Sequence, residues 1–162
     1  MNTYSMLKME KIINSLGIFI SLMIPMMTLL MIVIIVARYF FGEGLTGLQE
    51  LVMYMHALIF LGCAGYVHHK DEHVRVDIFY RGASYKYKNM VNIILGLLFL
   101  VPICFVIGYF SIEQIGMAWQ SKEGSTEAGG LKLVYIQKTL ILLFPFTLLI
   151  TIIHKFMSRK WN

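Results

Sequence analysis

Four long apolar stretches alternate with short polar segments along this chain. The apolar stretches cover about residues 14–36, 48–67, 89–110 and 133–153. A helix needs about 20 apolar residues to cross the hydrocarbon core of a bilayer, and each stretch is long enough to do so. The pattern therefore predicts an all-α integral membrane protein with four transmembrane helices.

The composition leaves little of the chain outside the membrane. Hydrophobic residues make up 58% of the 162 residues and charged residues only 14%, with a mean hydropathy of +0.71. Only an N-terminal segment, three connections and a short tail lie outside the four stretches. We therefore expect a single four-helix transmembrane domain over residues 1–162, with no separate catalytic domain.

The basic residues are unevenly distributed, which predicts an orientation because Lys and Arg accumulate on the cytoplasmic side of membrane helices. The N-terminal segment, the second connection and the tail hold ten of them: Lys8, Lys11, Lys70, Arg75, Arg81, Lys86, Lys88, Lys155, Arg159 and Lys160. The opposite side holds four: Arg38, Lys122, Lys132 and Lys138. Both termini are therefore expected in the cytoplasm. Because the basic residues flank apolar stretches, the net charge of +5 indicates membrane orientation and not nucleic-acid binding.

Two features predict departures from straight transmembrane helices. Pro25, Pro102 and Pro145 lie inside apolar stretches, where each removes a backbone hydrogen bond and bends its helix. Residues 76–88 mix aromatic and basic side chains. That mixture fits an additional helix lying along the cytoplasmic membrane surface.

The start of the second helix carries a polar pattern. Thr46 and Gln49 fit a capping box, in which both side chains bond free backbone N–H groups. Glu50 then falls in the first turn, where the helix dipole favours a carboxylate. The alternative role for Glu50 is contact with a partner subunit or a cation pathway, since ionisable groups near membrane depth tend to face protein or water.

Histidine is the one residue type here suited to a cofactor such as haem. The candidates are His56, His68, His69, His73 and His154. His56 and His154 would differ in depth by roughly 15 to 20 Å, too far to bind one iron. His68 and His69 could match His154 in depth, but all three lie near the cytoplasmic membrane interface, where solvated histidines are ordinary. The sequence also lacks a nucleophile motif, a phosphate-binding glycine loop and metal-type cysteine spacing. We expect no cofactor, no metal site and no enzymatic activity.

The acidic residues argue against a solute pathway through this chain. Glu50 alone approaches the membrane interior, whereas pathways for charged solutes show several polar groups or interrupted helices near the midplane. The helices are suited to contact lipid and another protein. A self-sufficient small exporter and a membrane anchor of a redox complex remain alternatives.

Four short segments carry a resemblance to a known family. They are Arg38-Tyr39-Phe40-Phe41, Gln49-Glu50-Leu51, Phe60-Leu61-Gly62-Cys63-Ala64 and His73-Val74-Arg75-Val76-Asp77. With the chain length and the four spans, they resemble the small membrane subunit of tripartite ATP-independent periplasmic (TRAP) transporters. The family often has an aromatic residue and paired acids at positions 46–50, so only Glu50 carries over there.

The resemblance implies a scaffold subunit in the bacterial inner membrane. Its partners would be membrane lipids, a large polytopic membrane subunit and a periplasmic solute-binding protein that delivers an organic anion, a carboxylate or sugar acid, for sodium-coupled uptake. The residues expected to contact partners or fix the structure are Arg38 and Glu50 at the outer face, and His73, Arg75 and Asp77 at the inner face. Arg75 and Asp77 are expected to form an ion pair in the cytoplasmic connection.

Overall fold

A computed structural model of the chain describes residues 3–73 and 82–158, and the regular elements within these ranges are all helical. The elements are α1 (Thr3–Ser21), α2 (Met23–Phe41), α3 (Thr46–Lys70), α4 (Tyr85–Leu95), a π-helical segment (Gly96–Leu100), α5 (Val101–Gln120), α6 (Val134–Thr139), a 3₁₀ segment (Leu140–Leu142) and α7 (Leu143–Ser158). The prediction of an all-α protein is confirmed.

The helices join into four long rods, each long and apolar enough to span a membrane. The spans run over Leu7–Phe41, Thr46–Lys70, Tyr85–Gln120 and Val134–Met157. We call them the first to fourth rods. The four predicted transmembrane helices are therefore confirmed, and every rod is longer than the apolar stretch that predicted it. The helical hydrogen bonding continues past the apolar residues into the polar ends.

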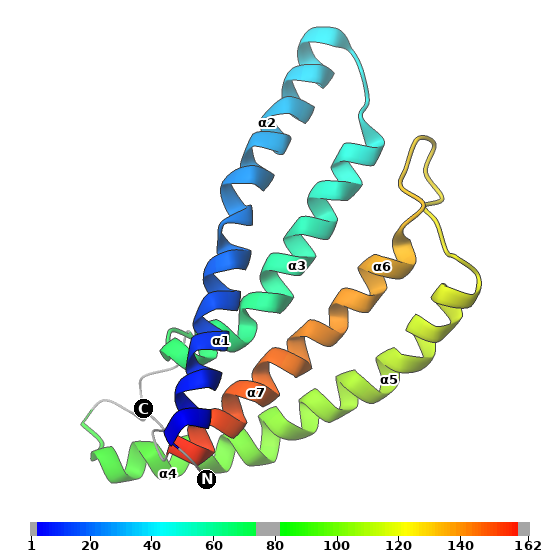
Figure 1. Cartoon of the computed structure of the whole chain (residues 1–162). Helices are drawn as coiled ribbons and strands as arrows, with labels where there is room; N and C mark the ends of the chain where they lie inside the picture. Colours follow the sequence, from blue (N-terminus) through cyan, green and yellow to red (C-terminus); the bar gives the residue numbers. More distant parts are fainter. Residues whose placement is uncertain (1–2, 74–81, 159–162) are drawn as a thin grey trace.

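The rods run alternately up and down, so the connections gather at two ends of the molecule (Figure 1). One end, which we call the loop end, holds residues 42–45 and 121–133. The other, which we call the terminal end, holds the starts of α1 and α4 and the last turns of α3 and α7. The sequence predicted the same grouping, with the first and third connections on one side and the second connection on the other.

The second and fourth rods form the centre of the bundle. α3 packs along α7, α1 packs on both, and α5 packs on α7. The buried cluster at the α3, α5 and α7 contact consists of Ala64, Cys104 and Leu148.

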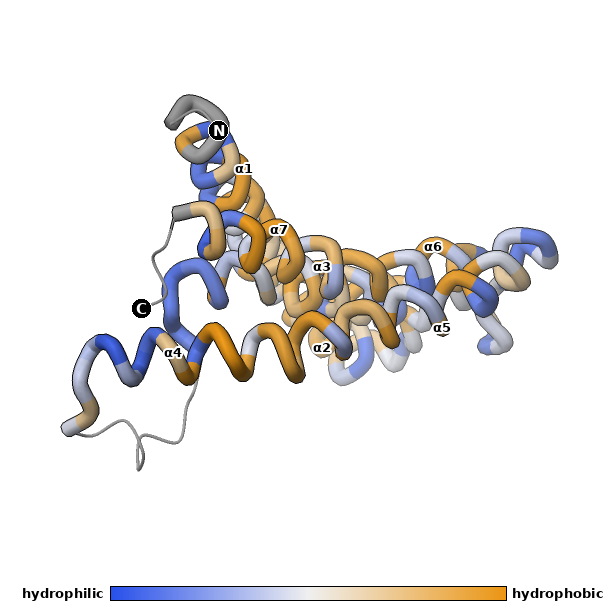
Figure 2. The backbone as a smooth tube through the Cα atoms, turned by 90° about the horizontal axis from the view of Figure 1, so that it is seen from below, coloured by the Kyte–Doolittle hydropathy of each residue, from blue (hydrophilic) through white to orange (hydrophobic). Residues whose placement is uncertain are grey.

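Apolar residues run along the rods and hydrophilic residues collect at the ends (Figure 2). Most large apolar side chains of α2 and α5 are exposed, as expected of helices that contact lipid.

Each proline follows an irregularity in its rod. The helix is interrupted at Leu22 just before Pro25. The π-helical segment precedes Pro102, and the 3₁₀ segment precedes Pro145. Proline lacks an N–H and its ring crowds the carbonyl one turn earlier, so regular α-helical bonding fails on that side of the residue.

The prediction of a capping box at Thr46 is wrong, because the structure does not form it. Leu45 is the N-cap of α3, and no side chain bonds the free N–H groups there. Thr46 is already the first helical residue, so its hydroxyl is one position too late to cap the helix. The backbone N–H of Gln49 donates instead to the Leu45 carbonyl at 3.0 Å.

The proposed surface helix over 76–88 is described only in its last part, because residues 74–81 lie outside the described ranges. Tyr85 to Lys88 form the first turn of α4, which continues into the third rod. The Ser84 hydroxyl caps this turn by accepting from the Tyr87 N–H at 3.3 Å.

Candidate functional site

Glu50 joins the start of α3 to the long connection at the loop end. It is the fifth residue of α3 and only 9% exposed. Its carboxylate accepts hydrogen bonds from the Leu131 backbone N–H at 2.6 Å and from the Ser125 hydroxyl. The Ser125 N–H donates to the Leu131 carbonyl at 2.9 Å, so the two partners are themselves bonded. We call these three residues the Glu50 clasp, and they hold the 121–133 connection against α3.

Glycines make room for the Glu50 clasp. A Cβ atom at Gly130 would collide with the Ser125 hydroxyl and lie 2.7 Å from a Glu50 carboxylate oxygen. A Cβ at Gly47 would lie 3.1 Å from the Gly129 carbonyl oxygen. The glycine-rich composition of this connection therefore serves close approach to α3.

A second set of contacts ties the end of α5 to α6. The Trp119 indole N–H donates to the Thr139 hydroxyl at 2.9 Å, and its ring meets that of Tyr135 edge to face at 4.7 Å. The Lys122 ammonium lies 4.9 Å from the Trp119 ring centre, a cation–π contact. Lys122 has a positive φ of 47°, which turns the chain sharply after α5.

The loop end also carries an open pocket of about 240 Å³ between α3, the connection and α6. Glu123 lines it and is paired with the Lys138 ammonium at 2.6 Å. Tyr54 lines it from one turn below Glu50, with a buried hydroxyl that has no protein hydrogen-bond partner. These groups surround the clasp and lie at the end of the bundle, away from its middle.

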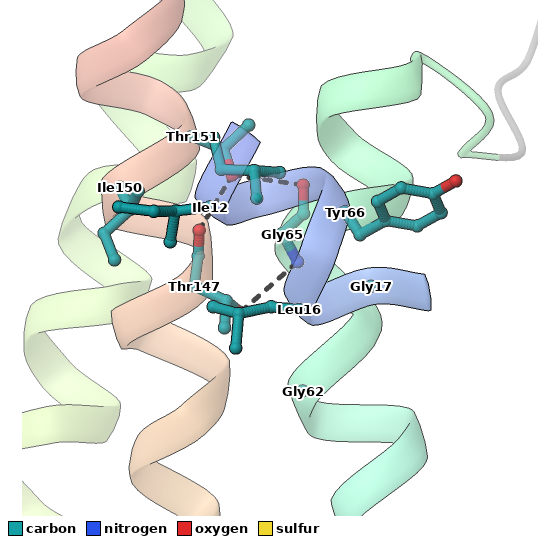
Figure 3. Close-up of a pocket in the computed structure, with 10 residues that line it drawn as sticks. Ile12, Leu16, Gly17, Gly62, Gly65, Tyr66, Thr147, Ile150 and Thr151 are labelled. Carbon is teal, nitrogen blue, oxygen red and sulfur yellow. Dashed lines mark hydrogen bonds between the residues drawn. The ribbon is translucent and has the colours of Figure 1, made fainter. Parts of the chain in front are cut away.

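Nearer the terminal end, α1, α3 and α7 meet at a joint built on glycine (Figure 3). The Gly65 N–H donates to the Thr147 hydroxyl at 3.3 Å. The Thr151 hydroxyl shares its proton between the Gly65 carbonyl at 3.1 Å and the Thr147 carbonyl of its own helix at 2.8 Å. A Cβ at Gly65 would collide with the Thr147 backbone. In the same way Gly17 leaves room for the ring of Tyr66. Small residues let membrane helices approach closely enough to bond one another in this way.

The cavity inside this joint has a volume of only about 20 Å³. Its walls are largely apolar and include Ile12, Leu16 and Ile150 (Figure 3). A single water needs about this much space, so the cavity is too small for an organic solute. The joint is a packing contact and not a passage.

The terminal end holds a pair of histidines, an ion pair and His73. The rings of His69 and His154 meet edge to face at 5.1 Å. Lys155 is 7% exposed, and its ammonium lies 3.8 Å from an Asp71 carboxylate oxygen. His73 Nε2 lies 3.3 Å from the Ala64 carbonyl oxygen, which places this ring against the end of α3.

The predicted site residues do not form one constellation. Arg38 is exposed in the last turn of α2, where a cation complements the helix dipole, and it shares the loop end with buried Glu50. His73 lies at the terminal end, while Arg75 and Asp77 lie outside the described residues. His56 is exposed on α3 and stacks on Phe60 of the same helix at 6.3 Å. Among the described residues, no three His, Cys, Asp or Glu side chains are grouped to hold a metal ion.

Sequence reasoning missed the partners of Glu50 and the glycine joint. Ser125 and Leu131 lie 75 and 81 residues from Glu50, and no pattern in a single sequence links such distant positions. The joint had a weak signal, since Gly62 and Gly65 lie one helical turn apart on α3. That spacing marks a face with small side chains but does not identify Thr147 as its partner.

Comparison with known proteins supplies the family. A model of the family "Tripartite ATP-independent periplasmic transporters, DctQ component" matches residues 27–160. Searches of curated proteins and of solved structures found no match. The matched region includes most of α2 and all of α3, α5 and α7, and therefore both the Glu50 clasp and most of the glycine joint. With four spans and a family match over most of its length, this chain belongs to the DctQ family, the small membrane component of TRAP transporters.

Proposed function

We propose that this chain is a single-domain scaffold subunit that packs against the large membrane subunit of a TRAP transporter. In this role it supports sodium-coupled uptake of an organic anion, a carboxylate or sugar acid, delivered by a periplasmic binding protein. The match to the DctQ family over residues 27–160 carries the proposal. The family is a transporter component, and the proposed role is structural and not enzymatic.

The exposed apolar faces of the two outer rods support a scaffold role. Phe40 and Phe41 end α2 with exposures of 81% and 75%, and Phe105 and Phe110 are each 66% exposed on α5. Lipid and a membrane protein both fit such faces, because neither requires polar groups on the helix. We assign one outer face to the large subunit and the other to lipid.

The interior of the bundle supports the same role. The three-helix joint encloses only about 20 Å³, and its hydroxyls bond the backbone of neighbouring helices. Transport sites in membrane proteins lie near the midplane and are built from discontinuous helices and several polar groups. The transported anion and its coupling ion are therefore assigned to the large subunit.

We propose that the terminal end faces the cytoplasm and the loop end the periplasm, in a bacterial inner membrane. The uneven distribution of Lys and Arg supports this orientation. The Glu50 clasp would then hold the 121–133 connection ready for the periplasmic binding protein, with Arg38 exposed on the same side. His73, Arg75 and Asp77 would fix the cytoplasmic connection.

Purification of the tagged chain from its native membrane in mild detergent tests the proposal. Mass spectrometry is expected to find one much larger polytopic protein at a comparable amount, and the complex in liposomes is expected to take up an organic anion. Transport by the chain alone would instead support a small exporter. Recovery with redox subunits and a haem absorbance band would support a membrane anchor.

A further inference from the structure

A groove of about 250 Å³ opens at the terminal end between the two central rods and the third rod. Its polar lining comes from three different helices, with His68 on α3, Asn92 on α4 and Lys155 on α7. Its apolar lining includes Leu95, Phe99 and Ile103.

The groove is divided into a polar head and an apolar track. Leu95, Phe99 and Ile103 follow one another at intervals of four residues and are 47%, 61% and 46% exposed. From Leu95 to Ile103 the track extends about 12 Å along the third rod, at 1.5 Å per residue. Lys155, by contrast, is 7% exposed and lies at the polar head. An amphiphile with one charged group and long chains matches this division.

A bilayer around the four spans would place the polar head at headgroup depth. His68 and Lys155 each stand two residues before the end of their spans, which finish at Lys70 and Met157. The π-helical segment Gly96–Leu100 lies beside the groove and contributes to its wall. Such segments are frequent at functional sites.

The described charges at the two ends of the molecule favour an anion in this groove. The terminal end carries six lysines against three carboxylates: Lys8, Lys11, Lys70, Lys86, Lys88 and Lys155, with Glu10, Asp71 and Glu72. The loop end carries four basic residues against five carboxylates: Arg38, Lys122, Lys132 and Lys138, with Glu43, Glu50, Glu113, Glu123 and Glu127. Among the described residues, the Asp71 carboxylate lies 3.8 Å from the Lys155 ammonium.

We propose that this groove binds one anionic phospholipid. The phosphate would lie against the Lys155 ammonium and the Asn92 amide, with His68 beside it, and an acyl chain would lie along Leu95, Phe99 and Ile103. Basic pockets between transmembrane helices are suited to anionic headgroups. A free phosphate ion would leave the apolar track unused. The inference concerns the chain itself and does not depend on the transported solute.

Native mass spectrometry of the delipidated full-length chain tests this site with added phosphatidylglycerol or phosphatidylcholine at equal concentration. Phosphatidylglycerol is expected to bind more tightly. Lys155→Gln removes the charge at the polar head and is expected to weaken phosphatidylglycerol binding about tenfold, the effect of losing one charge-assisted hydrogen bond. Lys86→Gln, at an exposed lysine of the same end, is the matched control and is expected to bind like the wild type.

A steric pair of variants tests the apolar track separately. Ile103→Trp fills the track without changing charge and is expected to weaken lipid binding. Ile94→Trp, on the same rod and equally exposed but outside the groove lining, is expected to leave it unchanged. Equal binding of both lipids, or equal binding by Ile103→Trp and Ile94→Trp, would overturn the proposal. Displacement of the lipid by millimolar inorganic phosphate would also overturn it, because the site would then select a free anion.

Discussion

At the scale of single residues, Glu50 has a role that its position in the sequence does not reveal. Near a helix N-terminus a carboxylate interacts with the helix dipole, an effect worth about 0.3 to 1 kcal/mol at an exposed site. Here the side chain is 9% exposed, and its two oxygens accept hydrogen bonds from two residues of the connection that lie 75 and 81 positions away in the sequence. Removing the carboxylate leaves two partly buried donors without this partner, which we expect to cost more than the dipole interaction.

Glu50→Ala is therefore expected to release the 121–133 connection and to cost about 1 to 3 kcal/mol in local stability. Amide hydrogen exchange at Leu131 is the direct measurement, because this N–H bonds Glu50. Glu50→Gln is expected to retain most of the protection, since its oxygen accepts from Leu131 and its amide donates to the Ser125 hydroxyl. Glu43→Ala, at an exposed acid of the same end, is the control. Unchanged exchange in Glu50→Ala would contradict the clasp.

Gly65→Ala tests the joint at the same scale. The added methyl collides with the Thr147 backbone, which cannot rotate away as a side chain would. Overpacking of this kind costs about 1 to 3 kcal/mol, so a lower unfolding temperature in detergent is expected. Gly108→Ala is a matched control within α5, where an added Cβ meets nothing within 4 Å. Equal unfolding temperatures for the two variants would mean that α3 and α7 are further apart than described.

At the scale of helices, the hydropathy pattern predicted the number and order of the rods but not how they meet. Crossing the bilayer imposes the apolar stretches directly, and prolines impose local irregularities, so both are visible in the sequence. Thr46 shows the limit for helix ends, because a shift of one residue removes a side chain from the capping position. The contact of α3 with α7 depends on Gly65 and Thr147, which are 82 residues apart.

Thr151→Val tests how strongly hydrogen bonds hold α3 to α7. Valine keeps the shape of threonine but removes the hydroxyl, which bonds both the Gly65 carbonyl of α3 and the Thr147 carbonyl of its own helix. Interhelical hydrogen bonds in membranes contribute about 0.6 to 2 kcal/mol, and a loss of this size in unfolding free energy is expected. The control is Thr28→Val, whose hydroxyl bonds only the carbonyl of Ile24 in the same helix. A larger loss in Thr28→Val than in Thr151→Val would contradict the assignment.

At the scale of the whole molecule, the alternation of the rods gives an accessibility prediction. Gly44→Cys lies at the loop end and Lys86→Cys at the terminal end, both exposed. In intact cells a membrane-impermeant thiol reagent added to the periplasm is expected to label Gly44→Cys, and Lys86→Cys only after permeabilisation. The parent for both is a chain with Cys63 and Cys104 replaced by Ser. The reverse labelling would invert the proposed orientation without changing the fold.

The unequal lengths of the rods have a consequence for the surrounding bilayer. The first and third rods contain 35 and 36 residues, against 25 and 24 for the central pair. At 1.5 Å per residue the outer rods are about 53 Å long and the central pair about 37 Å, while a hydrocarbon core measures about 30 Å. A helix longer than the core tilts or carries its ends into the headgroups. A change in bilayer thickness would therefore act first on the tilt of the two outer rods, the same rods whose apolar faces are proposed to contact lipid and the large subunit.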